Sequence, residues 1–105
     1  MNDASYYEAH VTVDLKRYNV QVAVEHLNGL CSSRGFKFAS LTQTVQGRDK
    51  HSYILTGHDK QRSHLLERMV QMIKLLKLHG YPIERYKIED ITLDSRVEDS
   101  FGLLR

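Results

Sequence analysis

Two kinds of hydrophobic periodicity follow one another along this chain, in an order that few folds can accommodate. Apolar side chains occupy every second position from Tyr7 to Leu15, which is typical of a strand with one buried face. Apolar residues then recur at helical spacing from Val20 to Cys31, and again from Leu65 to Leu76. Segments rich in aromatic or β-branched residues, or with apolar residues at alternate positions, predict further strands. The expected elements are strands at 7–15, 36–45, 51–56 and 83–93 and helices at 20–31 and 65–76.

The order of these segments is strand, helix, strand, strand, helix, strand. Right-handed crossovers from each strand over a helix give the split βαβ, ferredoxin-like sandwich. This is an α+β fold with two helices on one face of a four-stranded antiparallel sheet. We expect the first and last strands to lie side by side at its centre. With 105 residues there is room for one core, so residues 1–93 are expected to form a single domain, followed by an acidic tail, 94–105.

The element boundaries carry familiar local signals. Asn19 is a suitable N-cap for the first helix, and Gly35 a suitable left-handed stop. Residues 46–50 are polar and contain one glycine, which predicts a hairpin turn between the second and third strands. Residues 57–59 are expected to end the third strand, and residues 80–82, with their glycine and proline, to end the second helix.

Several classes of protein are disfavoured. The sequence has no run of about 18 apolar residues, so we expect no membrane span and no membrane partner. Residues 1–7 lack the basic and apolar regions of a secretory signal. Cys31 is the only cysteine, which excludes an internal disulfide and a cysteine-rich zinc site. A cytoplasmic location is therefore expected.

Charge is distributed unevenly although the formal net charge is only +2. Residues 34–87 carry eleven Lys or Arg against four Asp or Glu, whereas both flanking segments are net acidic. A positive middle favours anionic partners through long-range attraction, and a mixed, solvated surface is the alternative. Non-specific contact with nucleic acid would involve a basic group around the predicted hairpin and second helix, namely Arg48, Lys50, Lys60 and Arg62.

The uncovered face of the predicted sheet is where chemistry is most plausible. If the apolar positions of the first and last strands face the helices, their polar positions share the other face. Strand two adds Thr42 if Phe38 points outward. The resulting candidates are His10 and Thr12 as catalytic residues and Glu8, Thr42, Arg85, Lys87 and Glu89 as ligand-binding residues. The alternative is a solvated sheet face with cross-strand ion pairs of little functional meaning.

These residue types suit a phosphate or a carboxylate ligand. Arg85 offers a planar fork for bidentate hydrogen bonds, Lys87 a compact positive charge, and Thr12 a neutral hydroxyl. Glu89 could orient a base or a ribose hydroxyl. His10 could act as a general acid or base near neutral pH.

One short segment resembles a known catalytic motif. His10-Val11-Thr12-Val13 is similar to the His-x-Thr-x motif of the 2H phosphoesterases. The resemblance implies that His10 serves as acid or base and that Thr12 contacts the phosphate. That family pairs two such motifs, and this chain contains one, so a symmetric homodimer would be needed to bring two copies together.

The overall pattern also resembles small uncharacterised bacterial proteins. They share a His-x-Thr-Val first strand, a Gly-x-Lys after the first helix and an Arg-x-Lys-Ile-Glu last strand. In this chain those motifs are His10–Val13, Gly35–Lys37 and Arg85–Glu89. The resemblance supports the fold and draws attention to the open face, and it implies no particular activity.

The sequence therefore favours a domain that binds a small phosphate-bearing ligand, such as a nucleotide, on its open sheet face. Binding is favoured over catalysis, and no cofactor is expected. No metal site is predicted either, because His51, His58 and His64 lack metal-ligand spacing. The alternatives are a 2H-like phosphodiesterase that uses His10 and a structural or regulatory homo-oligomer without a ligand. Sequence-specific RNA binding is disfavoured because the third strand lacks the aromatic signature of RNA-binding modules.

Overall fold

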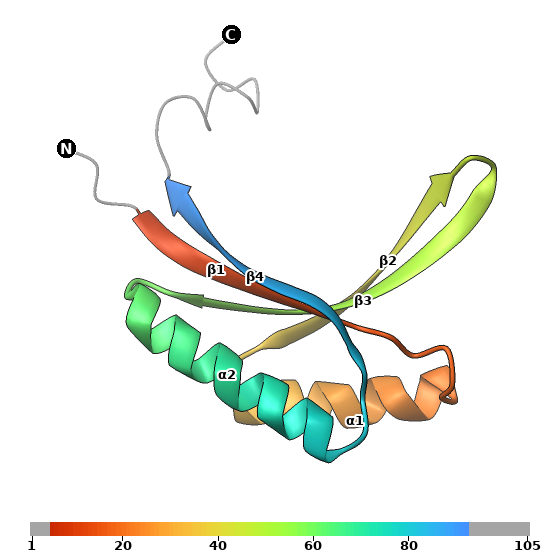
Figure 1. The fold of residues 1–105 in the computed structure, drawn as a ribbon, viewed down its shortest axis with the longest axis horizontal. Helices are drawn as coiled ribbons and strands as arrows, with labels where there is room; N and C mark the ends of the chain where they lie inside the picture. The colour runs from red at the N-terminus through yellow and green to blue at the C-terminus, as the bar shows by residue number, and fades with distance from the viewer. Residues whose placement is uncertain (1–4, 93–105) are drawn as a thin grey trace, which may run out of the picture.

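The chain folds in the predicted order of strands and helices. The computed structural model describes residues 5–92, and the predicted tail, 94–105, lies outside this range. All four strands form one antiparallel sheet, and both helices pack on the same face of it (Figure 1). The predicted α+β fold, with the element order βαββαβ and two helices on one face of a four-stranded antiparallel sheet, is thus confirmed. The elements are β1 (Ser5–Val13), α1 (Val20–Ser33), β2 (Lys37–Val45), β3 (Arg48–Asp59), α2 (Arg62–Leu78) and β4 (Ile83–Thr92).

The strand order is β2-β3-β1-β4. The first and last strands are neighbours, as the sequence predicted, but the expectation that both are central is wrong. β1 shares the centre with β3, and β4 is an edge strand. The reason is topological. The connection from β3 through α2 crosses over β1 before the chain re-enters the sheet, so β4 can pair only with the outer edge of β1.

The core lies between the sheet and the helices, and β1 supplies its middle. Ala9, Val11 and Val13 are all buried, and they alternate with residues that point to the other side of the sheet. Leu27 of α1 and Met72 of α2 are also buried, at positions of the apolar stripes that the sequence predicts. Cys31 lies in this core, where burial raises the pKa of its thiol to about 12. In that environment Cys31 is an unreactive residue with a structural role.

The β2–β3 hairpin is longer than the sequence predicts. Its turn consists of Gln46 and Gly47 alone, with φ angles of 54° and 76°. Two positive φ angles are the signature of a type I′ turn, whose twist matches that of paired strands. Pairing therefore begins at once, with Val45 opposite Arg48. The tip of the hairpin projects well beyond the helices (Figure 1).

β3 also runs further at its other end. The sequence predicts a break at residues 57–59, whereas pairing with β1 continues to Asp59. Gly57 is buried, and a Cβ atom there would lie only 2.9 Å from two ring carbons of Phe36. The glycine thus makes room for an aromatic ring in the core instead of ending the strand. As a consequence, His58 is a strand residue with a defined direction.

Arg68 of α2 joins the ends of several elements beneath this strand. Its Nη1 donates to the carbonyl oxygen of His58 at 2.8 Å, and its Nη2 donates to that of Gly35 at 3.0 Å. The guanidinium also lies 5.5 Å from the centroid of the Phe36 ring. One side chain therefore ties the end of α1, the end of β3 and α2 together through charge-assisted bonds.

Asp59 completes this junction. Its Oδ1 accepts a hydrogen bond from the backbone N–H of Gln61, and its Oδ2 lies 3.4 Å from Nη1 of Arg68. The bond from Gln61 has the largest effect on the pKa of Asp59. Together with attraction to His64 and Arg68, it outweighs desolvation and lowers that pKa below its ordinary value of 3.8.

Gly57→Ala should destabilise the protein by about 1–3 kcal/mol, because the new methyl group overlaps the ring of Phe36. Gly29→Ala is the matched control, since Gly29 lies within α1 with no atom inside 4 Å of the added Cβ position. That change should stabilise the helix by about 0.5–1 kcal/mol. Urea unfolding measures both. Equal midpoints for Gly57→Ala and the wild type would contradict the packing described here.

Asp59→Asn should lower the melting temperature at pH 7, since it removes the charge that pairs with Arg68. Because the folded-state pKa of Asp59 is depressed, the carboxylate's stabilisation is fully present above its ordinary value of 3.8 and is lost as pH falls through the folded-state pKa. The difference between wild type and variant should therefore shrink below about pH 3.8. Glu67→Gln, on an exposed position of α2, controls for net charge. A difference that does not depend on pH would refute this assignment.

Candidate functional site

The face of the sheet that the helices leave uncovered, called the open face below, carries three rows of side chains. Residues directly opposite each other in neighbouring strands point to the same side. The register therefore places almost all of the predicted site residues on this face. From β3 through β1 to β4, the rows are His58, Glu8 and Glu89; then Thr56, His10 and Lys87; then Ile54, Thr12 and Arg85.

Thr42 is the exception and corrects a sequence-based expectation. Its placement on the open face required Phe38 to point outward, but Phe38 packs against the core and lies opposite Leu55. Thr42 has the same parity, so it points to the helix side, where its Oγ1 lies 3.0 Å from Nδ1 of His51. The even-numbered positions of β2 begin with the apolar Phe38 and continue with the polar Ser40, Thr42 and Thr44, so the sequence does not show which set of side chains faces the helices.

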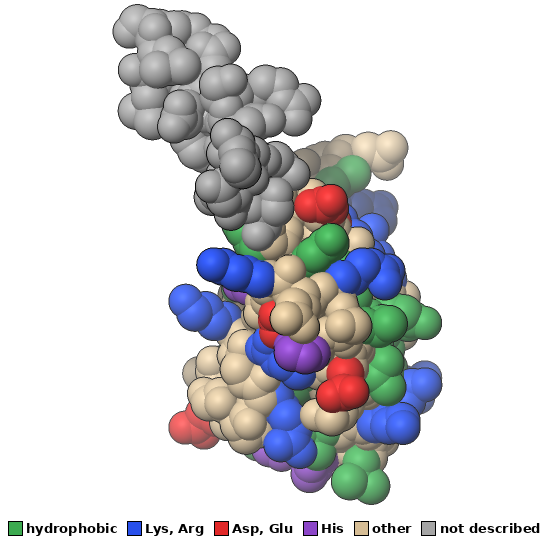
Figure 2. All heavy atoms as spheres, turned by 90° about the vertical axis from the view of Figure 1, so that its left-hand side faces the viewer, with side chains coloured by type: hydrophobic (Ala, Val, Ile, Leu, Met, Phe, Trp, Pro, Cys, Tyr) green, Lys and Arg blue, Asp and Glu red, His purple; other side chains and the backbone are tan. Residues whose placement is uncertain are grey.

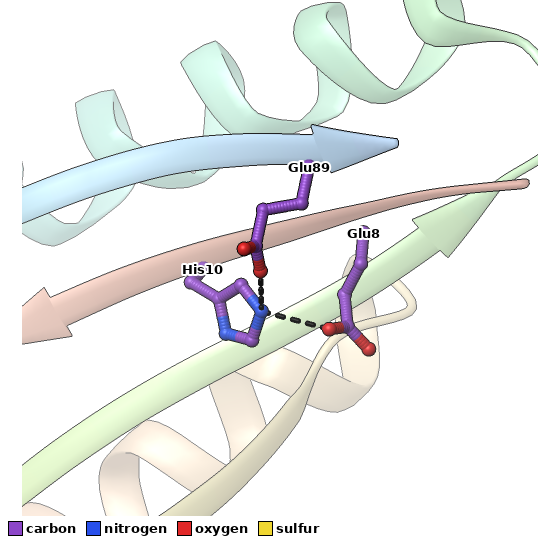
Figure 3. Close-up of side chains that lie close together, drawn as sticks. All are labelled: Glu8, His10 and Glu89. Atoms are coloured by element: carbon purple, nitrogen blue, oxygen red, sulfur yellow. Dashed lines mark hydrogen bonds and ion pairs between the residues drawn. The ribbon is translucent and has the colours of Figure 1, made fainter. Parts of the chain in front are cut away.

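Four residues form what we call the carboxylate–imidazole cluster, namely Glu8, His10, His58 and Glu89. Nε2 of His10 lies 2.8 Å from Oε1 of Glu8 and 3.3 Å from Oε1 of Glu89 (Figure 3). Nε2 of His58 lies 2.6 Å from Oε2 of Glu8. The imidazole of His10 is thus held between carboxylates from two strands, and one of these carboxylates is shared with a second imidazole.

Glu8 is the best-connected member of the cluster. Burial is the largest single influence on its carboxyl group and by itself raises the pKa. The hydrogen bonds from His58 and His10, together with their charges, outweigh that effect and lower the pKa of Glu8 below its ordinary value of 4.5. Glu8 is therefore a carboxylate at neutral pH, with both oxygens engaged.

Each carboxylate of the cluster has a second partner that holds its far oxygen. For Glu8 this partner is His58, whose ring also lies 5.5 Å from that of Tyr6. For Glu89 it is Lys87, whose Nζ lies 3.4 Å from Oε2. The oxygens that remain, Oε1 in both residues, face His10. The three oxygen and nitrogen atoms offered by Glu8, His10 and Glu89 lie within 4.8 Å of one another.

A second feature, which we call the polar hollow, lies further along the same face. It has a volume of about 440 Å³. Two of its lining residues, Thr12 and Arg85, belong to the predicted site, and Thr12 is only 7% exposed. The remaining lining residues come from the hairpin and from the start of β4, and they are Gln43, Lys50, Ser52, Ile54 and Glu84.

A larger hollow of about 580 Å³ lies under the hairpin, on the side of the helices. Core-side residues such as Val13, Leu15 and Tyr53 form part of its wall. Its acidic and basic residues balance, with three of each: Asp14, Asp49 and Glu84 against Lys16, Arg48 and Lys50. None of the predicted site residues lines it.

The sequence analysis did not assign six residues to the site that the structure brings there: Gln43, Lys50, Ser52, Ile54 and Glu84 around the polar hollow, and His58 beside Glu8. It places Lys50 in a turn and His58 in a strand break, and it gives no role to Ser52. A regular alternation was present from Ser52 to His58, with Tyr53, Leu55 and Gly57 at the intervening positions. Continuing that alternation through the glycine would have placed His58 on the polar side of β3, whereas its position opposite Glu8 depends on the register between β1 and β3.

The charges of the carboxylate–imidazole cluster and its neighbour Lys87 are of both signs. Figure 2, which shows the left-hand side of the view in Figure 1, has basic, acidic and histidine side chains interspersed, with no broad region of one sign. The positive sequence segment thus does not translate into a uniformly positive surface here. Selective binding of a charged ligand on this surface therefore depends on local groups of side chains, such as those that line the polar hollow.

Comparison with known proteins adds little to this picture. No protein-family model matches the chain, and no curated protein matches it. Among solved structures it is similar to one titled "De novo designed protein Foldit4", with 6% sequence identity and a TM-score of 0.46. That similarity covers 86% of this chain and 97% of the designed one. Within residues 5–92, neither helix has the length and apolar character required to cross a bilayer.

Proposed function

We propose that this protein binds a small phosphate-bearing ligand, such as a nucleotide, in the polar hollow of the open face. The observation that supports this most is the composition of the hollow. Arg85 and Lys50 supply two positive charges, Thr12 and Ser52 supply hydroxyl groups, and Glu84 is the one acidic residue of the lining. Convergent donors of this kind, in a concave site, are what recognition of an anion requires.

Six of the seven lining residues have a role in this proposal. The Arg85 guanidinium forms two parallel hydrogen bonds to phosphate oxygens, and the Lys50 ammonium adds a flexible point charge. Thr12 and Ser52 donate neutral hydrogen bonds. Ile54 offers an apolar surface for a ring or a base, and Glu84 an acceptor for a ribose hydroxyl or an amino group. A volume of about 440 Å³ is within the range of pockets that hold small molecules.

The charge of the two hollows favours the open face over the helix side. The polar hollow has two basic residues against one acidic residue, while the larger hollow carries three of each sign. An anion gains no net attraction in the larger hollow. Lys87 lies in the adjacent row of the open face, opposite His10, and adds a positive charge on the same side.

A phosphodiesterase that uses His10 is the second candidate. It is favoured by the position of His10, which is two residues from Thr12 on the same strand and face. In that role His10 would exchange a proton with the ligand. Its Nε2 is already engaged by Glu8 and Glu89, so a substrate must compete with these carboxylates for the imidazole. Binding alone requires no such exchange.

A homo-oligomer without a ligand is the third candidate. It draws on apolar side chains that α2 exposes, with Leu66, Val70 and Leu78 exposed by 39%, 40% and 78%. Scattered exposed apolar residues are common on monomers, so this observation carries less weight than the polar hollow.

The proposal predicts that phosphate compounds stabilise the protein through Arg85. A thermal-shift panel of inorganic phosphate, nucleotides, cyclic nucleotides and sugar phosphates, in buffer with a metal chelator, should contain at least one stabilising compound. At about 100 times its dissociation constant, that compound adds about 2.7 kcal/mol to stability. Arg85→Ala should weaken its binding about 10- to 100-fold, because a charge-assisted bidentate contact is lost.

Two threonines provide a matched comparison within the same experiment. Thr12→Val should weaken binding, since it removes a hydroxyl of the hollow, whereas Thr42→Val should leave binding unchanged because Thr42 points to the other face. Cleavage of a panel compound, abolished by His10→Ala, would favour the phosphodiesterase instead. A panel without any stabilising compound, or stabilisation that survives in Arg85→Ala, would reject the proposed site.

A further inference from the structure

The carboxylate–imidazole cluster has the composition and spacing of a metal site. We propose that Glu8, His10 and Glu89 bind one divalent transition-metal ion of the Zn²⁺ class, with His58 holding Glu8 in position. Neither the polar hollow nor the proposed phosphate ligand is needed for this inference. It rests on the geometry of the cluster alone.

The spacing of the donor atoms is the first argument. In a tetrahedral zinc site with bonds of about 2.0–2.1 Å, neighbouring ligand atoms lie about 3.3–3.4 Å apart. Nε2 of His10 lies 2.8 Å from Oε1 of Glu8 and 3.3 Å from Oε1 of Glu89. An ion would take the place of the proton that Nε2 now shares with these oxygens, and small side-chain rotations would widen the shorter distance.

The second argument is that the candidate ligands are already oriented. Each carboxylate presents one oxygen to His10, and its other oxygen is held from outside by His58 or Lys87. Outer partners of this kind fix the direction of ligating carboxylates in known metal sites. Figure 3 shows the three candidate ligands, with the ring of His10 between carboxylates that come from β1 and β4. A random pair of surface carboxylates would lack such support.

The donor set also indicates which ions fit. One imidazole and two carboxylates provide two negative charges, which balance a divalent ion. An imidazole nitrogen suits Zn²⁺, Co²⁺ and related ions, whereas Mg²⁺ and Ca²⁺ prefer oxygen ligands alone. Cys31 cannot contribute a thiolate, because it is buried in the core. Three protein ligands leave a coordination position open, and the exposed fractions of Glu8, His10 and Glu89, 23%, 24% and 44%, give solvent access to it.

Equilibrium dialysis of the full, untagged chain against Zn²⁺, with Co²⁺ absorption as a second readout, tests this proposal. We expect one ion per chain, together with the visible absorption of Co²⁺ bound by protein ligands. His10→Ala and Glu89→Gln should each abolish saturable binding over the concentration range that saturates the wild type. Excess Mg²⁺ should not displace the bound Zn²⁺, because Mg²⁺ prefers oxygen ligands to an imidazole nitrogen.

Two further variants separate a positioning role from general damage. His58→Phe keeps a ring beside Tyr6 but cannot hold Glu8, so the affinity for Zn²⁺ should fall about 10- to 100-fold without loss of the site. His51→Ala removes a histidine that contacts Thr42 on the helix side and should bind Zn²⁺ like the wild type. Melting temperatures in chelator identify any variant that fails to fold. If another variant fails to fold, the test relies on Glu89→Gln, because Glu89 is the most exposed of the three ligands.

The outcomes that would overturn the proposal are distinct. A wild-type chain that takes up no Zn²⁺ would do so, as would unchanged uptake by both His10→Ala and Glu89→Gln. If His51→Ala loses Zn²⁺ binding to the same extent as His10→Ala, the ion does not bind on the open face. Because the phosphate panel is measured in chelator, failure of the metal site and failure of the phosphate site remain separate results.

Discussion

Strand β1 is the constraint on which the remainder of this structure depends. It is hydrogen-bonded to β3 on one side and to β4 on the other, so its register fixes both neighbours at once. Its apolar positions enter the core, and its polar positions, Glu8, His10 and Thr12, define the open face. A slip of one residue would exchange these two sets and expose the core residues. The burial that stabilises the fold therefore also determines which side chains can meet a ligand.

The open face divides into two parts with different chemistry. Toward the start of β1, carboxylates and imidazoles face one another across three strands. Toward its end, the basic and hydroxyl side chains of Arg85, Lys50 and Thr12 surround the polar hollow. Ion pairs on a solvent-exposed face contribute little to stability, each about 0–1 kcal/mol. The buried contacts between sheet and helices stabilise the fold, so the groups on the open face can serve a ligand without being required by the core.

The same physical argument separates the expectations that hold from those that do not. The alternation in β1 and the stripes of both helices reflect burial directly, and each was legible in the sequence. Thr42 was misplaced because β2 is an edge strand whose far end projects beyond the helices, so neither face there is consistently apolar. His58 was missed because a glycine precedes it. Gly57 leaves room for Phe36, which is distant in sequence, and that role cannot be read from local signals.

By itself the sequence determined the elements, their order and which residues of β1 and β4 share a face, because periodicity records burial within each segment. It also determined that β1 and β4 are neighbours, because right-handed crossovers leave few alternatives. The tertiary structure alone decided that β4 is an edge strand, that β2 turns Thr42 away, and that His58 reaches Glu8. The last of these facts depends on pairing between residues 50 positions apart, which no local pattern encodes. A site built across three strands exists only once the strands are in register.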